Sequence, residues 1–310
     1  MGDTALAPVT LFTYNRLWHT RQTIEALQRN ELALKSDLFV FSDGPRSEPR
    51  RKQVAEVRKY LKNIGGFRRV TVIERDHNLG LARSIIAGVT ELVNNYGRVI
   101  VLEDDLATSP FFLRYMNNAL EFYRDEERVI SIHGYLYPLR APLPDTFFLR
   151  GADCWGWATW KRGWDLFEPD GRKLLKELKE RDLQKRFDLN GSHPYTRMLK
   201  WQARGALNSW AIRWHASAFL ADKLTLYPGR SLIANIGLDA SGAHCSPTDR
   251  FDIMLADKAV KIGSIPLEEH SGAIQALENY YRETRPSLLK SALSKLLLRI
   301  RGVMHSCNVY

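Results

Sequence analysis

The stretch V-I-V-L-E-D-D at residues 99–105 decides which fold this sequence predicts. Its apolar half is mostly β-branched, which is typical of a strand buried on both faces in a parallel sheet. Glu103, Asp104 and Asp105 follow at the carboxyl end of that strand, the edge where open α/β sheets bind ligands. Three adjacent carboxylates repel one another, so we expect a divalent cation to offset their charge. The alternative is a solvated loop that caps the next helix, which we expect at 106–123.

Strands and helices alternate before this stretch. Strands are expected at 8–13, 37–42, 70–74 and 99–102, and helices at 18–28, 47–61 and 81–96. The alternation predicts an α/β fold with a mostly parallel, twisted, Rossmann-like sheet flanked by helices. Polar residues follow the first three strands, among them Arg16, Asp43 and His77. Because the carboxyl ends of parallel strands meet at one edge of the sheet, we expect a ligand site there.

The second half of the chain is less periodic. Strands are expected within 127–135, 147–150, 224–227 and 231–236, and helices across 169–204 and 209–220. C-W-G-W-A-T-W at 154–160, with Trp164 close behind, places four tryptophans within ten residues. We expect one or two of them in the core and the others to line a cleft, since indole faces stack well on sugar rings. The candidates for acceptor contact are Trp155, Trp157 and Trp210.

The net charge of +10 and the predicted pI near 9.5 suggest an acidic partner, either nucleotide phosphates or an anionic membrane surface. Simple solubility is the alternative explanation. We expect no nucleic-acid partner, since no recognition motif accompanies the charge. Residues 287–301, S-L-L-K-S-A-L-S-K-L-L-L-R-I-R, have leucines on one side and bases on the other. This pattern predicts either an interfacial helix on an anionic membrane or a helix packed on protein.

Several classes of protein are excluded by missing motifs. No glycine-rich phosphate loop follows the first strand, which argues against dinucleotide enzymes and P-loop kinases. The three cysteines have no metal-ligand spacing, which favours a reducing compartment. We find no signal-peptide pattern and no apolar run long enough to span a bilayer. We therefore expect a cytoplasmic protein that binds peripherally to the inner face of the membrane.

The segment E-D-D-L-A-T-S-P-F-F-L-R-Y-M at 103–116 resembles the metal-binding motif of GT-A glycosyltransferases. The resemblance is to the inverting N-acetylglucosaminyltransferases of the N-glycan and O-mannosyl type and their bacterial relatives, and it covers residues 8–135. It implies a nucleotide-sugar-binding half at 1–135 and an acceptor-binding half of the same domain at 136–280. The basic amphipathic helix would then form a C-terminal segment at 281–310.

The same resemblance implies roles for individual residues. Asp105 would ligate Mn²⁺ or Mg²⁺, and the metal would bridge the donor diphosphate and stabilise the leaving group. Asp104 and Glu103 would contact the ribose and the nucleotide, and Asp43 would bind the uracil. The other nucleotide-sugar contacts implied are Arg16, His77, Arg83 and His244.

The general base is where this sequence departs from the family. An inverting transferase needs a carboxylate to deprotonate the acceptor hydroxyl. The eukaryotic relatives take it from an aspartate pair before a tryptophan, where this chain has Asn208 and Ser209 before Trp210. Asparagine cannot act as a base, so Asp239 is the first candidate and Asp153 the second.

The sequence therefore predicts a metal-dependent inverting glycosyltransferase. It would move a sugar, with N-acetylglucosamine as the first candidate, from a UDP-sugar to a glycan or glycolipid in bacterial cell-surface polysaccharide or lipopolysaccharide synthesis. Asn208 favours an alternative, a non-catalytic nucleotide- or glycan-binding protein on the same fold. A sugar-phosphate nucleotidyltransferase is the third hypothesis, although residues 13–16 lack the glycine-rich signature of that class.

Overall fold

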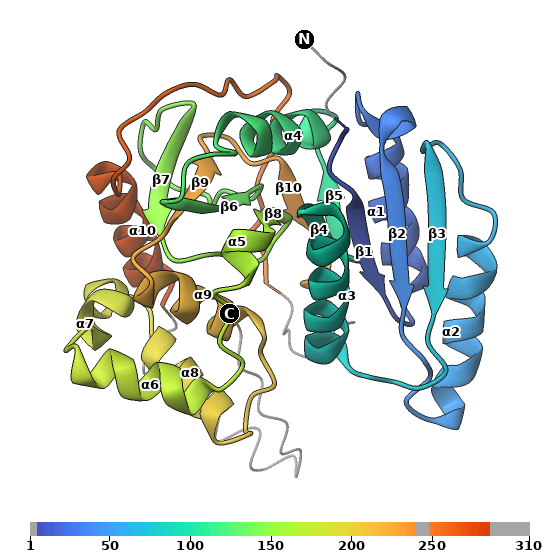
Figure 1. The fold of residues 1–310 in the computed structure, drawn as a ribbon, viewed down its shortest axis with the longest axis horizontal. Coiled ribbons are helices and arrows are strands. Elements are labelled where there is room, and N and C mark those ends of the chain that lie inside the picture. The colour runs from blue at the N-terminus through green and yellow to red at the C-terminus, as the bar shows by residue number, and fades with distance from the viewer. Residues whose placement is uncertain (1–4, 240–247, 286–310) are drawn as a thin grey trace.

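The computed structural model describes residues 5–239 and 248–285, and Figure 1 shows how they fold. The strands of the main sheet are β1 (Val9–Thr13), β2 (Asp37–Ser42), β3 (Arg69–Glu74), β4 (Arg98–Glu103), β6 (Val129–His133), β7 (Thr146–Arg150), β8 (Trp157–Trp160) and β9 (Leu224–Pro228). Within the described residues, these eight strands have the order β3-β2-β1-β4-β8-β6-β9-β7. All run in one direction except β7 and β8. The prediction of an α/β fold with a mostly parallel sheet flanked by helices is confirmed.

Helices cover both faces of this sheet (Figure 1). They are α1 (Leu17–Gln28), α2 (Glu48–Leu61), α3 (Leu81–Tyr96), α4 (Phe112–Phe122), α5 (Lys161–Trp164), α6 (Gly171–Glu180), α7 (Gln184–Phe187), α8 (Tyr195–Ala203), α9 (Ala211–Leu220) and α10 (Ser271–Glu283), with the short 3₁₀ helices η1 (Ala33–Lys35) and η2 (Leu189–Gly191). One face packs against α1, α2, α4 and α10, and the other against α3, α5 and α9. A third cluster joins α6 and α8 to α9, so α9 is buried along almost its whole length and is not an amphipathic surface helix.

Side-chain alternation along the strands explains why the sheet has a core on each face. Val99 and Val101 of β4 belong to the core beside α3, whereas Ile100 and Leu102 belong to the core beside α1. Successive side chains of a strand point to opposite faces, so a strand with helices on both sides is apolar throughout. β4 pairs in parallel with β1, with Leu11 opposite Leu102, and the two strands therefore end at the same edge.

The prediction of a helix at 106–123 is wrong for its first residues, because the helix begins at Phe112. Leu106–Thr108 forms β5, which pairs antiparallel with β10 (Ile233–Asn235) in a second, two-stranded sheet. Pro110 has no N–H and disfavours a helical conformation at Ser109. The N–H of Ser109 instead donates to the carbonyl of the residue before β10 at 2.9 Å. The helix is therefore confined to α4, and the small sheet brings the segment after β10 to the end of β4.

The tryptophans mostly build the core. Trp157 is fully buried, and its ring centroid lies 5.4–5.7 Å from those of Trp164, Trp210 and Trp214. The expectation that Trp157 and Trp210 contact an acceptor is therefore corrected, because neighbouring indoles enclose both side chains. Of the three expected acceptor contacts, Trp155 keeps part of its surface exposed.

Two expectations concern the ends of the described segments. Across residues 5–239 and 248–285, no helix combines the length and the apolar character that crossing a bilayer requires. Of the helix expected at 281–310, residues 286–310 lie outside the described residues, as does His244.

The tryptophan cluster leads to a first prediction. Trp157→Ala should lower the free energy of unfolding by about 3–5 kcal/mol, since it removes a large side chain from a closely packed core. Trp18→Ala is the matched control, because Trp18 is 59% exposed and should change the stability by less than about 0.5 kcal/mol. Urea denaturation followed by circular dichroism measures both values, and equal effects of the two substitutions would contradict the core assignment.

Candidate functional site

Arg16 holds the acidic end of β4 together. It lies three residues after the end of β1, directly before α1, and its Nη2 donates to Asp104 Oδ1 and, at 2.8 Å, to Asp105 Oδ2. The three side chains are largely buried. Hydrogen bonds between charged groups are among the stronger ones in proteins, and partial burial reduces their screening by water. In this structure Arg16 therefore offsets much of the negative charge that follows β4.

The protonation of the acidic residues reflects both burial and repulsion. Burial raises the pKa of Glu103 to about 8, and the charges of Asp105 and Asp104 add to the effect. Burial also raises the pKa of Asp104, although Arg16 opposes the increase. At neutral pH Glu103 is therefore mostly protonated, and its carboxyl group can donate a hydrogen bond.

Asp43 shapes the neighbouring loop at the end of β2. Its Oδ1 accepts hydrogen bonds from the N–H groups of Gly44 at 3.0 Å and Leu79 at 2.9 Å, and its Oδ2 accepts one from Gly80 at 2.9 Å. Gly80 has a φ of 75°, in the left-handed region that favours glycine, and it begins α3. Asp43 thus ties the end of β2 to the loop before α3, while its Oδ2 can accept one further hydrogen bond.

His77 and Arg83 lie on that loop and on the first turn of α3. His77 is exposed, and its backbone packs so closely on Gly44 that a Cβ there would lie 2.6 Å from the His77 carbonyl carbon. Arg83 is exposed and donates from Nε to the carbonyl of Leu79 at 2.9 Å. In the described part of the chain, neither forms a hydrogen bond or ion pair with the acidic residues after β4. Both residues instead lie on the loop and helix that Asp43 ties to the end of β2.

None of the site residues predicted from the sequence lies on the polar side of α1. His19 and Thr23 are buried, and Thr23 Oγ1 donates to the carbonyl of Asp104 at 2.9 Å. His19 Nε2 lies 3.1 Å from Asp239 Oδ2. The sequence does contain a signal for these two residues. They come three and seven positions after Arg16, and this spacing places them on the side of α1 that faces the end of β4.

Gly237 brings the segment after β10 against the acidic residues. The N–H of Ile236 donates to the carbonyl of Asp105 at 2.9 Å. A Cβ at Gly237 would lie only 2.1 Å from Asp105 Oδ2, so this approach requires glycine. Asp239 follows two residues later and is nearly half exposed. The small sheet thus carries one candidate base to the edge where Asp105 lies.

Asp153, the other candidate base, lies beside the end of β4. Because β4 and β8 are antiparallel neighbours, the segment that precedes β8 runs alongside Glu103. Burial raises the pKa of the Cys154 thiol, and the charges of Asp153, Glu103 and Asp105 add to the increase. Asp153 Oδ1 accepts from the Cys154 N–H and Oδ2 from the Tyr137 hydroxyl, both at 2.9 Å.

Histidines and tyrosines surround Asp153. The Nε2 of His133 lies 3.8 Å from Asp153 Oδ2, and burial lowers the pKa of His133 to about 4. Neither ring nitrogen of His133 has a hydrogen-bond partner among the described residues. Burial also lowers the pKa of His215 and lowers that of His193 to about 3. These three histidines are therefore uncharged at neutral pH.

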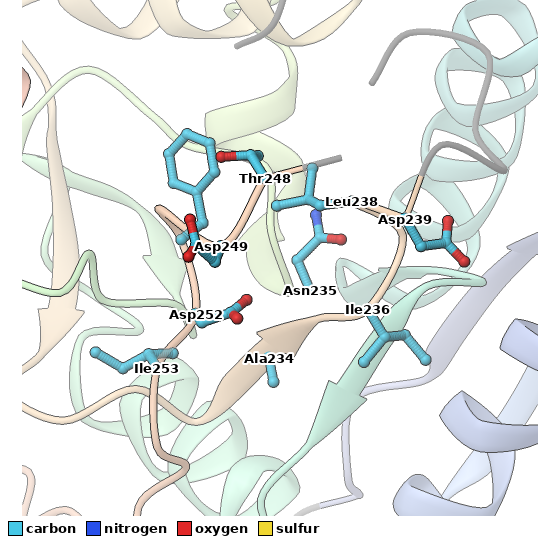
Figure 2. Close-up of a pocket in the computed structure, with 10 residues that line it drawn as sticks. Ala234, Asn235, Ile236, Leu238, Asp239, Thr248, Asp249, Asp252 and Ile253 are labelled. Carbon is cyan, nitrogen blue, oxygen red and sulfur yellow. The ribbon is translucent and has the colours of Figure 1, made fainter. Parts of the chain in front are cut away.

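A cavity of about 790 Å³ opens beside Asp239 (Figure 2). Figure 2 shows Asp249 and Asp252 on one side of it and Asp239 on the other. The lining combines carboxylates and an amide with apolar side chains and consists of Ala234, Asn235, Ile236, Leu238, Asp239, Thr248, Asp249, Phe251, Asp252 and Ile253. This volume and mixed lining suit a polar, ring-sized ligand. The contact between His19 and Asp239 links the cavity to the acidic end of β4.

Comparison with known proteins identifies no family. No protein-family model matches the chain, and no curated protein matches it. The solved structures that it matches include TarS of S. aureus, with 12% identity and a TM-score of 0.31. The match covers 47% of this chain and 25% of that one. At this level of similarity, neither the fold nor the activity of TarS transfers to this chain.

The raised pKa of Glu103 predicts how stability depends on pH. The folded protein keeps a proton on Glu103 that the unfolded chain releases between about pH 4.5 and 8, so this carboxyl lowers the free energy of unfolding as the pH rises through that range. Glu103→Gln has no such proton. Relative to the wild type, it should gain roughly 2–4 kcal/mol of stability between pH 5 and pH 8.

Urea denaturation at the two pH values, with EDTA present, measures this gain. The matched control is Glu56→Gln, which changes an exposed carboxylate on α2 and should show no such gain. A stability difference between Glu103→Gln and the wild type that stays constant with pH would show that Glu103 ionises normally in the folded protein.

Proposed function

We propose that this protein is a metal-dependent, inverting glycosyltransferase of the GT-A type. It would transfer a sugar, with N-acetylglucosamine as the first candidate, from a UDP-sugar to a glycan or glycolipid acceptor in bacterial cell-surface polysaccharide synthesis. One observation carries the proposal. Arg16 and the three acids that end or follow β4 lie at the carboxyl edge of a mostly parallel sheet, with another carboxylate, Asp153, beside them.

The acidic edge suits a hard divalent cation that takes part of its ligands from the substrate. Within the described residues, no group of three or more His, Cys, Asp or Glu side chains is arranged to hold a metal ion. Mg²⁺ typically binds one or two carboxylates together with substrate phosphates, and Asp105 offers such a carboxylate. Asp105 would therefore hold Mn²⁺ or Mg²⁺ in the presence of the donor. Bound there, the cation would stabilise the charge that develops on the UDP leaving group.

Arg16 would assist in binding the diphosphate. Its guanidinium is held by Asp104 and Asp105 at the edge of the sheet, and guanidinium groups bind phosphate oxygens with strong, directional hydrogen bonds. Asp43 orders the loop before α3 on the same edge. We assign the nucleotide to the space between this loop and the acids after β4, with His77 and Arg83 on its outer side.

Asp153 is the general base that we propose, which reverses the preference drawn from the sequence. Among the described residues, no lysine or arginine forms an ion pair with Asp153, and the histidines that face it are neutral. No cation of the described chain therefore holds the Asp153 carboxylate, and one of its oxygens can accept the proton of an acceptor hydroxyl. Asp239 contacts His19 and borders the cavity, so we assign it to positioning the acceptor.

Calorimetric titration with UDP tests the donor site. The wild type should bind UDP at least about tenfold more tightly with Mn²⁺ than with EDTA, a difference of ~1.4 kcal/mol. Asp105→Asn should remove that difference, because an amide is a far weaker ligand for a hard cation. Asp257→Asn, at an aspartate that is 78% exposed, is the control and should bind like the wild type. Absence of UDP binding by the wild type under both conditions would contradict the proposed donor.

Asp153→Asn tests the catalytic assignment. It should leave UDP binding unchanged and lower kcat by about 10²–10⁴-fold, since asparagine cannot accept the proton. Asp239→Asn should mainly raise the acceptor KM. Release of UDP from UDP-sugars in the presence of acceptor glycans measures both. Loss of kcat in Asp239→Asn alone would reverse the two assignments, and UDP binding without turnover of any UDP-sugar would favour the non-catalytic alternative.

A further inference from the structure

Two segments of the described chain carry much of the positive charge of this protein. Residues 46–76 contain ten lysines and arginines against four acidic residues, and residues 169–204 contain ten against five. With the +4 of residues 286–310, the excesses of +6 and +5 exceed the net charge of +10, so the remaining residues are net negative. The charge is therefore a property of particular surfaces, which a uniform effect on solubility does not explain.

The second of these segments, which includes α6 to α8, places its bases on the surface. All ten lysines and arginines of residues 169–204 are exposed. Helix α8 contains no acidic residue, and Arg197, Lys200 and Arg204 recur at the spacing of one helix side. Trp201 lies on that side as well, with the Arg197 guanidinium carbon 5.1 Å from its ring centroid. The opposite side of α8 is buried against α6 and α9.

Helix α8 begins near the part of the candidate site that contains Asp153, since the ring centroid of Tyr195 lies 4.5 Å from that of His215, which contacts the carbonyl of Ala152. Burial raises the pKa of Tyr195, the first residue of α8, and the nearby charge of Asp153 adds to the increase. Beyond α8 the chain reaches Trp210, which stacks on Trp157 at the beginning of β8. Figure 1 shows α6 and α8 at the lower left, at the end of the molecule toward which β1, β2 and β3 point. The basic surface therefore lies at the same end of the molecule as the edge of the sheet that carries the candidate site (Figure 1).

We propose that the exposed side of α6 and α8 docks on an anionic phospholipid bilayer. Charge complementarity favours this partner, because each lysine or arginine near an anionic membrane strengthens binding by roughly fivefold. Long basic side chains and tryptophan place their apolar parts against the lipid interface and their polar ends in water. The binding is mainly electrostatic, so it weakens as the salt concentration rises.

Docking through α6 and α8 turns the part of the candidate site that contains Asp153 toward the bilayer. A glycolipid acceptor would then reach Asp153 from the membrane surface, and this consequence rests on the proposed function. The docking itself does not depend on that function, since it involves exposed side chains of α6 and α8 to which the proposed function assigns no role. It also differs from the membrane helix expected at 286–310, because α6 and α8 belong to the folded core.

Charge reversal on α8 tests the proposal in the full-length chain. One variant combines Arg197→Glu, Lys200→Glu and Arg204→Glu. The matched control combines Arg114→Glu, Arg124→Glu and Arg128→Glu. These substitutions change the net charge by the same amount, also on exposed residues. Arg114 lies in α4 and the other two follow this helix, which is at the opposite edge of the molecule from α6 and α8 (Figure 1). Co-sedimentation is measured with vesicles of phosphatidylcholine alone and with about equal amounts of phosphatidylcholine and phosphatidylglycerol.

The wild type and the control should bind the anionic vesicles at least about tenfold more tightly than the neutral ones. The α8 variant should lose at least about tenfold in affinity for the anionic vesicles and keep the wild-type affinity for UDP, which separates this proposal from the proposed function. Equal losses in both variants, or no binding by the wild type, would overturn the docking. Tighter binding to a nucleic acid duplex than to anionic vesicles at the same salt concentration would assign the surface to that partner instead.

Thermal unfolding followed by circular dichroism shows whether each variant is folded. If the triple α8 variant does not fold, Lys200→Gln with Arg204→Gln replaces it, since two exposed amides disturb the helix less. That milder variant should lose roughly 25-fold in affinity for anionic vesicles. Unchanged vesicle binding by the folded milder variant would likewise overturn the docking.

Discussion

The attraction between Arg16 and the carboxylates of Asp104 and Asp105 is the interaction on which the rest of the site depends. A buried strand that ends in three acids is unfavourable, because the charges repel and each loses contact with water. The parallel pairing of β1 with β4 places Arg16 where it offsets that cost. The compensation is incomplete, and Glu103 keeps its proton to about pH 8. Fold and electrostatics are therefore coupled at this edge.

The two halves of the site differ in charge. Near Arg16, the side chains of Asp104 and Asp105 form ion pairs with its guanidinium, which suits a diphosphate and a cation. Around Asp153 the histidines are neutral and tyrosine hydroxyls are close, which suits the hydroxyl groups of a sugar. The main sheet places these environments side by side, because the segment before β8 runs alongside the end of β4. Under the proposed function, the donor would occupy the first and the acceptor the second.

The elements predicted well from the sequence are those set by local pattern. The strand at Asp37–Ser42 and the helix at Leu81–Tyr96 have the predicted bounds. The apolar residues of β4 are buried on both faces, as expected for a parallel sheet. The error at Leu106–Thr108 has a different origin, since these residues are extended through pairing with β10, more than 120 positions later. No local pattern reveals that partner.

The sequence by itself determined the alternation of strands and helices and the acids at the end of β4, and it predicted the carboxyl edge as the place of the candidate site. Periodicity and strand order are local properties, and they determine which side chains share a face or an edge. The tertiary structure alone decided that Arg16 pairs with Asp104 and Asp105, that Gly237 packs against Asp105 and that Trp157 lies in the core. Those outcomes depend on contacts between distant segments, and only packing determines which side chains meet.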